Sequence, residues 1–190
     1  MSLGAMRTTL TFAEDGRFEL SQFATTATLG YTRSSRWSFR GSIGAILDGG
    51  VKSASTDADI SAGFVVGLGV AKQWPLSHKM FINGSVNLGA SRVTTHQGHE
   101  PGVALIATDI RVGAIFGRTF GRVSPFALVR LFGGPVFWQS SAGSAITGTD
   151  IYHVQVGGGA SVSVGSGVSL LVDVSALGER AASLTLSKQL

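Results

Sequence analysis

The chain of 190 residues is basic, rich in glycine and poor in charged side chains. It has 15 lysines and arginines and 11 aspartates and glutamates, a net charge of +4, but only 14% of its residues are charged, against about 25% in soluble domains. Its 27 glycines argue against a helical bundle, because each glycine weakens a helix by about 1 kcal/mol relative to alanine. The absence of cysteine excludes disulfides and thiolate sites.

The length suits one domain, which we expect to span residues 7–190. Residues 1–6 are expected to lie outside it, as a tag remnant or a disordered segment. Met1–Met6 contain no apolar core of signal-peptide length, so we expect an export leader to be absent from this sequence. The basic side chains are scattered singly instead of clustering with aromatic residues, so we expect no nucleic-acid partner.

Apolar residues alternate with small or polar ones along most of the chain, which predicts β-strands. From Phe64 to Val70, for example, every second residue is large and apolar, and glycine occupies two of the positions between them. In chain order, the expected strands cover residues 7–13, 18–31, 37–48, 60–71, 80–91, 106–116, 123–138, 152–164, 169–176 and 182–189. The first and last are short, so the pattern predicts about ten strands and leaves eight as the alternative.

Two of these segments alternate less regularly than the others. Between Phe18 and Tyr31 the apolar positions change from even (Leu20) to odd (Phe23, Leu29), and this slip predicts a β-bulge. The segment 123–138 is apolar on both faces, with Arg130 on one of them.

The composition of the two faces indicates which one points inward. One face carries bulky apolar residues, and the other carries glycine, serine, asparagine and a few charges, whereas the solvated face of a soluble sheet carries Lys, Glu and Thr. Apolar outside and polar inside is typical of membrane barrels, and a lipid-exposed sheet must close because its edges cannot remain unpaired. The residues expected to form an interior polar network or to line a pore are Asp48, Asp109, Arg111, Arg130 and Asp173. Charges inside need pairing or water.

Links of unequal length join the strands. The longer ones, Gly49–Asp59, His96–Gly102 and Ser140–Asp150, all fall at one end, which predicts outer loops opposite short periplasmic turns. Aromatic residues gather near both ends, as in the interfacial belts of membrane proteins. The expected aromatic girdle comprises Tyr31, Trp37, Phe39, Trp74, Phe116, Phe120, Phe137, Trp138 and Tyr152.

With this alternation, the loop asymmetry and the closing segment from Gly178 to Leu190, the chain resembles the small outer-membrane β-barrel proteins of Gram-negative bacteria. The resemblance implies an all-β, closed, antiparallel, up-and-down transmembrane barrel in the bacterial outer membrane. It also implies contact with membrane lipids and lipopolysaccharide, and insertion by the outer-membrane assembly machinery, which reads a terminal Phe or Trp in family members where this chain has Leu190. We expect a monomer.

Two chemical alternatives rest on histidines. His153 follows Asp150 closely and could act as a general base oriented by that carboxylate, but the His-Ser pair of lipid-cleaving barrels is missing, so we expect no enzyme. His96, His99 and Glu100 could hold a metal ion, but no helix positions them, and a solvated loop is the better interpretation. No cofactor, catalytic residue or metal site is therefore expected.

These observations favour a structural role, in which the barrel anchors the membrane or binds a surface partner through its outer loops. The first alternative is a narrow passive pore for small solutes, with Arg111 and Arg130 giving anion preference. The second alternative is a soluble β-barrel that binds a lipid.

Overall fold

The computed structural model describes residues 1–12, 16–53, 57–98, 102–139 and 145–189 of the chain. They form one sheet of thirteen strands, entirely antiparallel in its pairings. The strands are β1 (Ser2–Phe12), β2 (Gly16–Thr32), β3 (Trp37–Lys52), β4 (Asp57–Ile60), β5 (Gly63–Pro75), β6 (Met80–His96), β7 (Val103–Arg118), β8 (Val123–Gly133), β9 (Val136–Gln139), β10 (Ala145–Asp150), β11 (Val154–Gly165), β12 (Val168–Leu177) and β13 (Arg180–Lys188). A 3₁₀ turn, Ser77–Lys79, joins β5 to β6. Among the described residues, no helix is long and apolar enough to cross a membrane.

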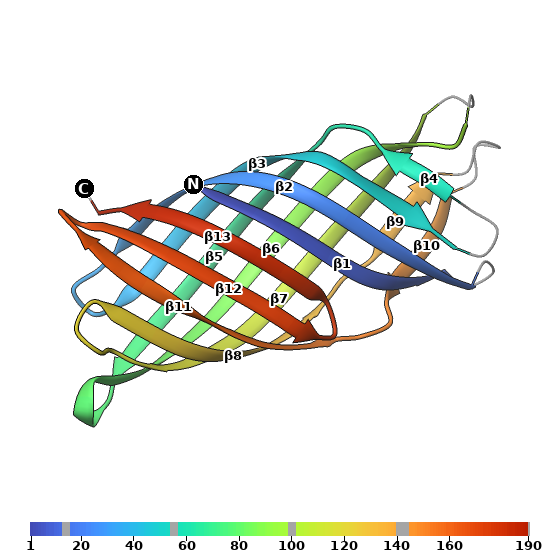
Figure 1. The fold of residues 1–190 in the computed structure, drawn as a ribbon. Helices are drawn as coiled ribbons and strands as arrows, with labels where there is room; N and C mark the ends of the chain where they lie inside the picture. Colours follow the sequence, from blue (N-terminus) through green and yellow to red (C-terminus); the bar gives the residue numbers. More distant parts are fainter. Residues whose placement is uncertain (13–15, 54–56, 99–101, 140–144, 190) are drawn as a thin grey trace.

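The sheet closes on itself through β1, and it does so differently at its two ends (Figure 1). Near the short turns, β1 pairs with β13, for example at Ala5 and Ala182. Near the long links, β1 pairs instead with β10, at Leu10 and Asp150. The hairpin of β12 and β13 therefore ends partway along the barrel. Beyond it, toward the long links, β10 replaces β13 as the partner of β1.

The closed sheet thus consists of two stacked rings that share most of their strands. The ring at the short-turn end runs β1, β2, β3, β5, β6, β7, β8, β11, β12, β13 and back to β1, which makes ten strands. The ring at the other end runs β1, β2, β3, β4, β6, β7, β9, β10 and back to β1, which makes eight. Both strand numbers expected from the sequence are present, each at one end.

The N-terminal residues belong to the barrel. Ser2 to Met6 lie in β1 and pair with both β2 and β13, so the expectation that residues 1–6 lie outside the domain is wrong. Their alternation is too short and too rich in small residues to distinguish them from a tag by sequence.

The predicted bulge in β2 is also misplaced. In β2 the even residues face inward throughout, from Phe18 to Thr28. The bulge lies in the neighbouring strand β3, where Phe23 is opposite Asp48 and Ala24 is opposite Ile46, which leaves Leu47 without a partner. The slip in the sequence has another cause: the apolar residues change from the outside of the wall to the inside.

The long links expected from the sequence are partly strand. β3 extends to Lys52 and β4 begins at Asp57, so most of the expected loop Gly49–Asp59 continues the barrel wall. Likewise β10 occupies the second half of the expected loop Ser140–Asp150 and pairs with β9 and β1. These extensions build the eight-stranded ring.

Candidate functional site

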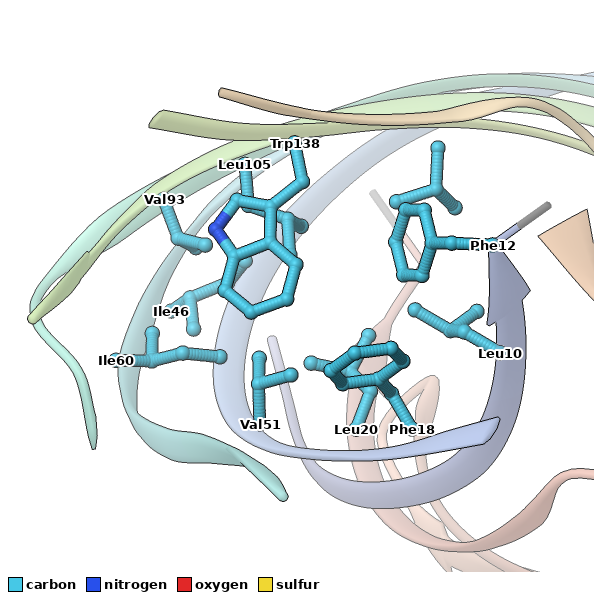
Figure 2. Close-up of a cluster of buried hydrophobic side chains, with 11 residues drawn as sticks. Leu10, Phe12, Phe18, Leu20, Ile46, Val51, Ile60, Val93, Leu105 and Trp138 are labelled. Atoms are coloured by element: carbon cyan, nitrogen blue, oxygen red, sulfur yellow. The ribbon is translucent and has the colours of Figure 1, made fainter. Parts of the chain in front are cut away.

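An apolar core fills the interior of the eight-stranded ring. We call it the plug, and it consists of Leu10, Phe12, Phe18, Leu20, Ile46, Val51, Ile60, Val93, Leu105, Val136 and Trp138. Figure 2 shows the labelled side chains pointing from the surrounding strands toward the barrel centre. An eight-stranded barrel is just narrow enough for side chains to fill, so the narrower ring and its apolar content fit each other.

Three aromatic rings form the centre of the plug. The Phe18 ring stands edge-on to Phe12, with centroids 5.3 Å apart, and edge-on to Trp138, at 5.5 Å. Trp138 is 9% exposed, and its indole Nε1 donates a hydrogen bond of 3.0 Å to Thr95 Oγ1. The prediction that Trp138 belongs to the outer girdle is therefore wrong, because β9 turns this side chain inward.

On the short-turn side of the plug, charged side chains cross the interior. Arg111 on β7 donates from Nη1 to Glu179 Oε1 at 2.6 Å and from Nη2 to Glu179 Oε2 at 2.8 Å. Its Nε also donates to Asp109 on the same strand. Glu179 lies in the turn between β12 and β13 and is 3% exposed. A two-pronged guanidinium–carboxylate contact of this kind is among the stronger polar interactions in proteins.

Further polar groups extend this network toward β8 and β12. Gln155 is fully buried and donates from Nε2 to Glu179 Oε1 at 3.2 Å, and its own Oε1 accepts from Arg130 Nη1 at 3.3 Å. Asp173 accepts a hydrogen bond from Ser183. Four of the five residues predicted for the interior thus line the lumen: Asp109, Arg111, Arg130 and Asp173.

Asp48 does not join them. It is exposed, its carboxylate accepts from the backbone N–H of Gly49, and it lies opposite the outward-facing Phe23. Residues directly opposite each other in an antiparallel pair share a face, so Asp48 lies on the outer wall. The physical reason is the bulge at Leu47, which reverses the alternation of β3 just before Asp48.

Two cavities remain in the lumen, both bordered by Arg111 and Arg130. One, of about 490 Å³, runs along β1 and β2 beside the network, from Ser2 to Leu10, Leu20 and Val136 of the plug. The other, of about 710 Å³, lies toward the short turns among mainly small and polar side chains, including Arg40 and Asn87. The ten-stranded ring is therefore incompletely filled, in contrast to the eight-stranded one.

Two residues central to the network, Glu179 and Gln155, are not found by sequence reasoning. Glu179 follows Gly178 in a tight turn, a position that usually exposes a carboxylate to solvent. Gln155 falls on the polar face of its strand without a charge to distinguish it. An available signal is the excess of arginine over acid on the inward positions of β7 and β8, which demands a further carboxylate nearby.

The outer wall of the barrel changes character along its length. Around the ten-stranded ring it is apolar, with Leu29, Ile43 and Leu68 among its most exposed side chains. Around the eight-stranded ring it is mainly polar, and the outward residues of β1, β2 and β6 there include Arg17, Glu19, Ser21, Thr9, Thr11, Arg92 and Thr94. The apolar side chains thus pass from outside to inside at the level where ten strands become eight.

Exposed aromatic side chains lie near both borders of the apolar wall. Toward the short turns are Tyr31, Trp37, Phe39, Trp74, Phe116 and Phe120, and toward the other end are Phe137 and Tyr152, all at least 40% exposed. Phe23 and Phe64 also face outward, at the border of the apolar wall nearest the eight-stranded ring, where Phe64 is opposite Arg92. From Phe64 to Trp74 on β5 the wall spans about 25 Å along the barrel axis, given the usual strand rise and tilt, which is the height of the apolar band in membrane barrels.

The contacts of the histidines do not support the two chemical alternatives suggested by the sequence. His153 Nδ1 lies 3.2 Å from the Phe132 carbonyl oxygen, and Asp150 accepts instead from Thr8 Oγ1 at 2.7 Å. His99 and Glu100 lie outside the described residues. The described part of the chain contains no cluster of three or more His, Asp or Glu side chains suited to a metal ion.

Comparison with known proteins identifies a shared fold. No protein-family model matches the chain, and neither does a curated protein sequence. Among solved structures, the chain is similar to the β-domain of the Bordetella autotransporter BrkA, with a TM-score of 0.53 and 14% identity over 98% of each chain. It is also similar to the translocator domain of the autotransporter NalP from Neisseria meningitidis, with a TM-score of 0.51 and 12% identity over 97% of this chain and 85% of that one. The protein therefore has the closed antiparallel fold of outer-membrane β-barrels.

Proposed function

We propose that this chain is an integral outer-membrane barrel that is closed to solutes and presents its eight-stranded end beyond the membrane as an anchoring or partner-binding surface. The observation that carries the proposal is the plug, because it fills the ring through which a solute would leave the lumen at that end. The apolar wall of about 25 Å supports the membrane location. The polar outer wall around the eight-stranded ring supports the projection of that end into water.

Conductance in planar lipid bilayers tests the closed state. We expect the refolded native protein to show no steady openings. The double variant Phe12→Ala/Trp138→Ala removes two of the three central rings and should show discrete current steps, since a cavity of about 710 Å³ among mainly small and polar side chains already lies toward the short turns. Each truncation of this type costs about 3–5 kcal/mol, so migration of the unboiled protein on a gel must first show that the variant folds.

The passive pore is the alternative that this experiment separates. Steady openings of the native protein, altered in ion preference by Arg111→Ala, would contradict the closed barrel and support the pore. A polypeptide-translocating role, suggested by the word translocator in the name of one similar structure, would require the same lumen to open further. Because the identity is 12%, that similarity supports the fold and does not favour this role.

The proposal includes no catalytic step. In support of this, His153 Nδ1 and Asp150 Oδ1 each make a hydrogen bond to another group, the Phe132 carbonyl oxygen and Thr8 Oγ1. Lipid hydrolysis lost in His153→Ala and retained in the matched His78→Ala variant would contradict this part of the proposal.

A further inference from the structure

The apolar wall of the barrel has a groove on one side. On its outer face Gly41 of β3 lies between Leu29 of β2 and Leu68 of β5, which are its partners in the sheet. These two leucines are 79% and 68% exposed, and they stand as ridges on either side of a residue without a side chain. Hollows of about 690 Å³ and 820 Å³ adjoin here and share Leu29, Gly41, Leu68 and Leu88.

The groove runs along the wall from mid-height to the short-turn border. One hollow reaches Ile43 and the other reaches Phe39, and Trp37 follows on the same face of β3. Ile43 and Trp37 are six residues apart, which corresponds to about 15 Å along the barrel axis. This length equals the hydrocarbon depth of one membrane leaflet, about 15 Å.

A cation stands at the mouth of the groove. Lys72 pairs with Trp37 across β3 and β5, next to the pair of Val70 and Phe39 that lines the groove. The Lys72 ammonium lies 5.0 Å from the Trp37 ring centroid and 5.5 Å from that of Trp74. Two tryptophan faces thus fix the position of the ammonium.

The acidic and basic side chains at the short-turn end have one sign of charge. It carries Arg33, Arg36, Lys72, Lys79, Arg118, Arg122 and Lys188. The sequence segments that build it, residues 29–42, 70–86, 112–128, 162–170 and 184–190, contain no Asp or Glu. At the opposite end, by contrast, two cations have carboxylate partners, in the Arg7–Glu19 and Lys52–Asp57 ion pairs.

We propose that this groove and Lys72 together form a binding site for one anionic phospholipid, with an acyl chain along Gly41 and the headgroup phosphate on Lys72. The apolar hollow alone would accept any lipid tail, whereas the ammonium selects a headgroup of net negative charge. Each lysine near a membrane surface favours anionic lipid by about 1 kcal/mol, which corresponds to a preference of about fivefold. The site rests on the proposed membrane location of the barrel.

The tryptophans of the protein report on this site directly. Trp37 and Trp74 flank the mouth of the groove, whereas Trp138 lies in the plug. We would reconstitute the full chain in vesicles of phosphatidylcholine mixed with phosphatidylglycerol, with bromine on the acyl chains of one or the other lipid. The quenching of tryptophan fluorescence by each brominated lipid gives their relative binding constant. The expected preference for phosphatidylglycerol is about fivefold.

Matched variants separate the site from the general charge of the rim. Lys72→Met should reduce the preference to about one, while Lys188→Met, at the same end but on β13, should leave it unchanged. Gly41→Leu should fill the groove and weaken binding of the anionic lipid. A side chain begins there without a clash, since a Cβ would meet Leu68 at 3.7 Å. Its control, Ala114→Leu on the outer face of β7, should have no effect.

Three results would overturn the proposal: no preference in the native protein, a preference that survives Lys72→Met, or equal losses in Lys72→Met and Lys188→Met. The failure of the membrane location itself would look different. In that case neither brominated lipid would quench Trp37 and Trp74, whatever the headgroup.

Discussion

Arg111 binds two carboxylates: Asp109, two residues away on its own strand, and Glu179, which the chain brings from 68 residues further on, in the last tight turn. Removing the guanidinium leaves both acids in the lumen without their main partner, and breaking a buried pair in this way costs about 3–5 kcal/mol. We therefore expect Arg111→Ala to lower the temperature at which the unboiled gel migration is lost, and to lower the urea concentration at half unfolding.

The matched control is Arg7→Ala. Arg7 forms an ion pair with Glu19 on the outer wall, where both side chains are at least 40% exposed, and exposed pairs contribute about 0–1 kcal/mol. Equal losses in the two variants would show that the network across the lumen contributes no more than a surface pair.

Individual residues also show how far sequence reasoning reaches. Alternation alone places Asp109, Arg111, Arg130 and Asp173 in the interior, because within an unbroken strand the face of a residue depends only on its parity. It misplaces Asp48 because the single extra residue Leu47 reverses that parity, and nothing in the run of residues around it distinguishes a bulge from regular strand.

The tight turn between β12 and β13 is more constrained sterically than the other tight turns. Gly178 has φ +75°, and a Cβ there would lie 1.9 Å from the Val154 carbonyl oxygen of β11. Gly178→Ala should therefore displace the hairpin, on top of the roughly 1–2 kcal/mol that a left-handed backbone costs a residue with a side chain. We expect a clear fall in the urea midpoint.

Gly121 provides the comparison for that prediction. It has φ +60° in the turn after β7, and a Cβ added there would meet no atom of the described residues within 4 Å, so Gly121→Ala should cost only the backbone term. A urea midpoint lowered equally by the two substitutions would mean that the contact with Val154 relaxes without cost.

The elements that the sequence pattern misassigns share one cause. That cause is the apolar core of the eight-stranded ring. It accounts for the slip in the apolar pattern of β2, for the inward side chain of Trp138 and for the strand at residues 145–150. A rule of apolar outside and polar inside, applied to the entire chain, misses a region where the barrel is built like a soluble protein. A signal is present in the residues around Phe18, whose outward neighbours Arg17 and Glu19 are charged.

The change of the outer wall from apolar to polar predicts where along the barrel the membrane ends. The absence of native cysteine allows single substitutions to be read without background. In vesicles, Thr9→Cys on the outer wall of the eight-stranded ring should react with a maleimide that cannot enter lipid. Ile43→Cys, 65% exposed on the apolar wall, should be protected until detergent is added.

Protection of Thr9→Cys, or labelling of Ile43→Cys in intact vesicles, would contradict this placement. Because either side chain already faces outward, neither substitution should disturb the interior.

The two-ring construction also bears on the order in which the barrel can assemble. Every pairing of the eight-stranded ring lies within residues 2–150, so that ring can close by joining Leu10 to Asp150 before the last hairpin has formed. Contacts between such distant segments form slowly, because a long loop must first close. The hairpin of β12 and β13 would then be added last, to a barrel whose other end is already closed. It would insert between β11 and β1 at the ten-stranded end only, where Glu179 binds Arg111.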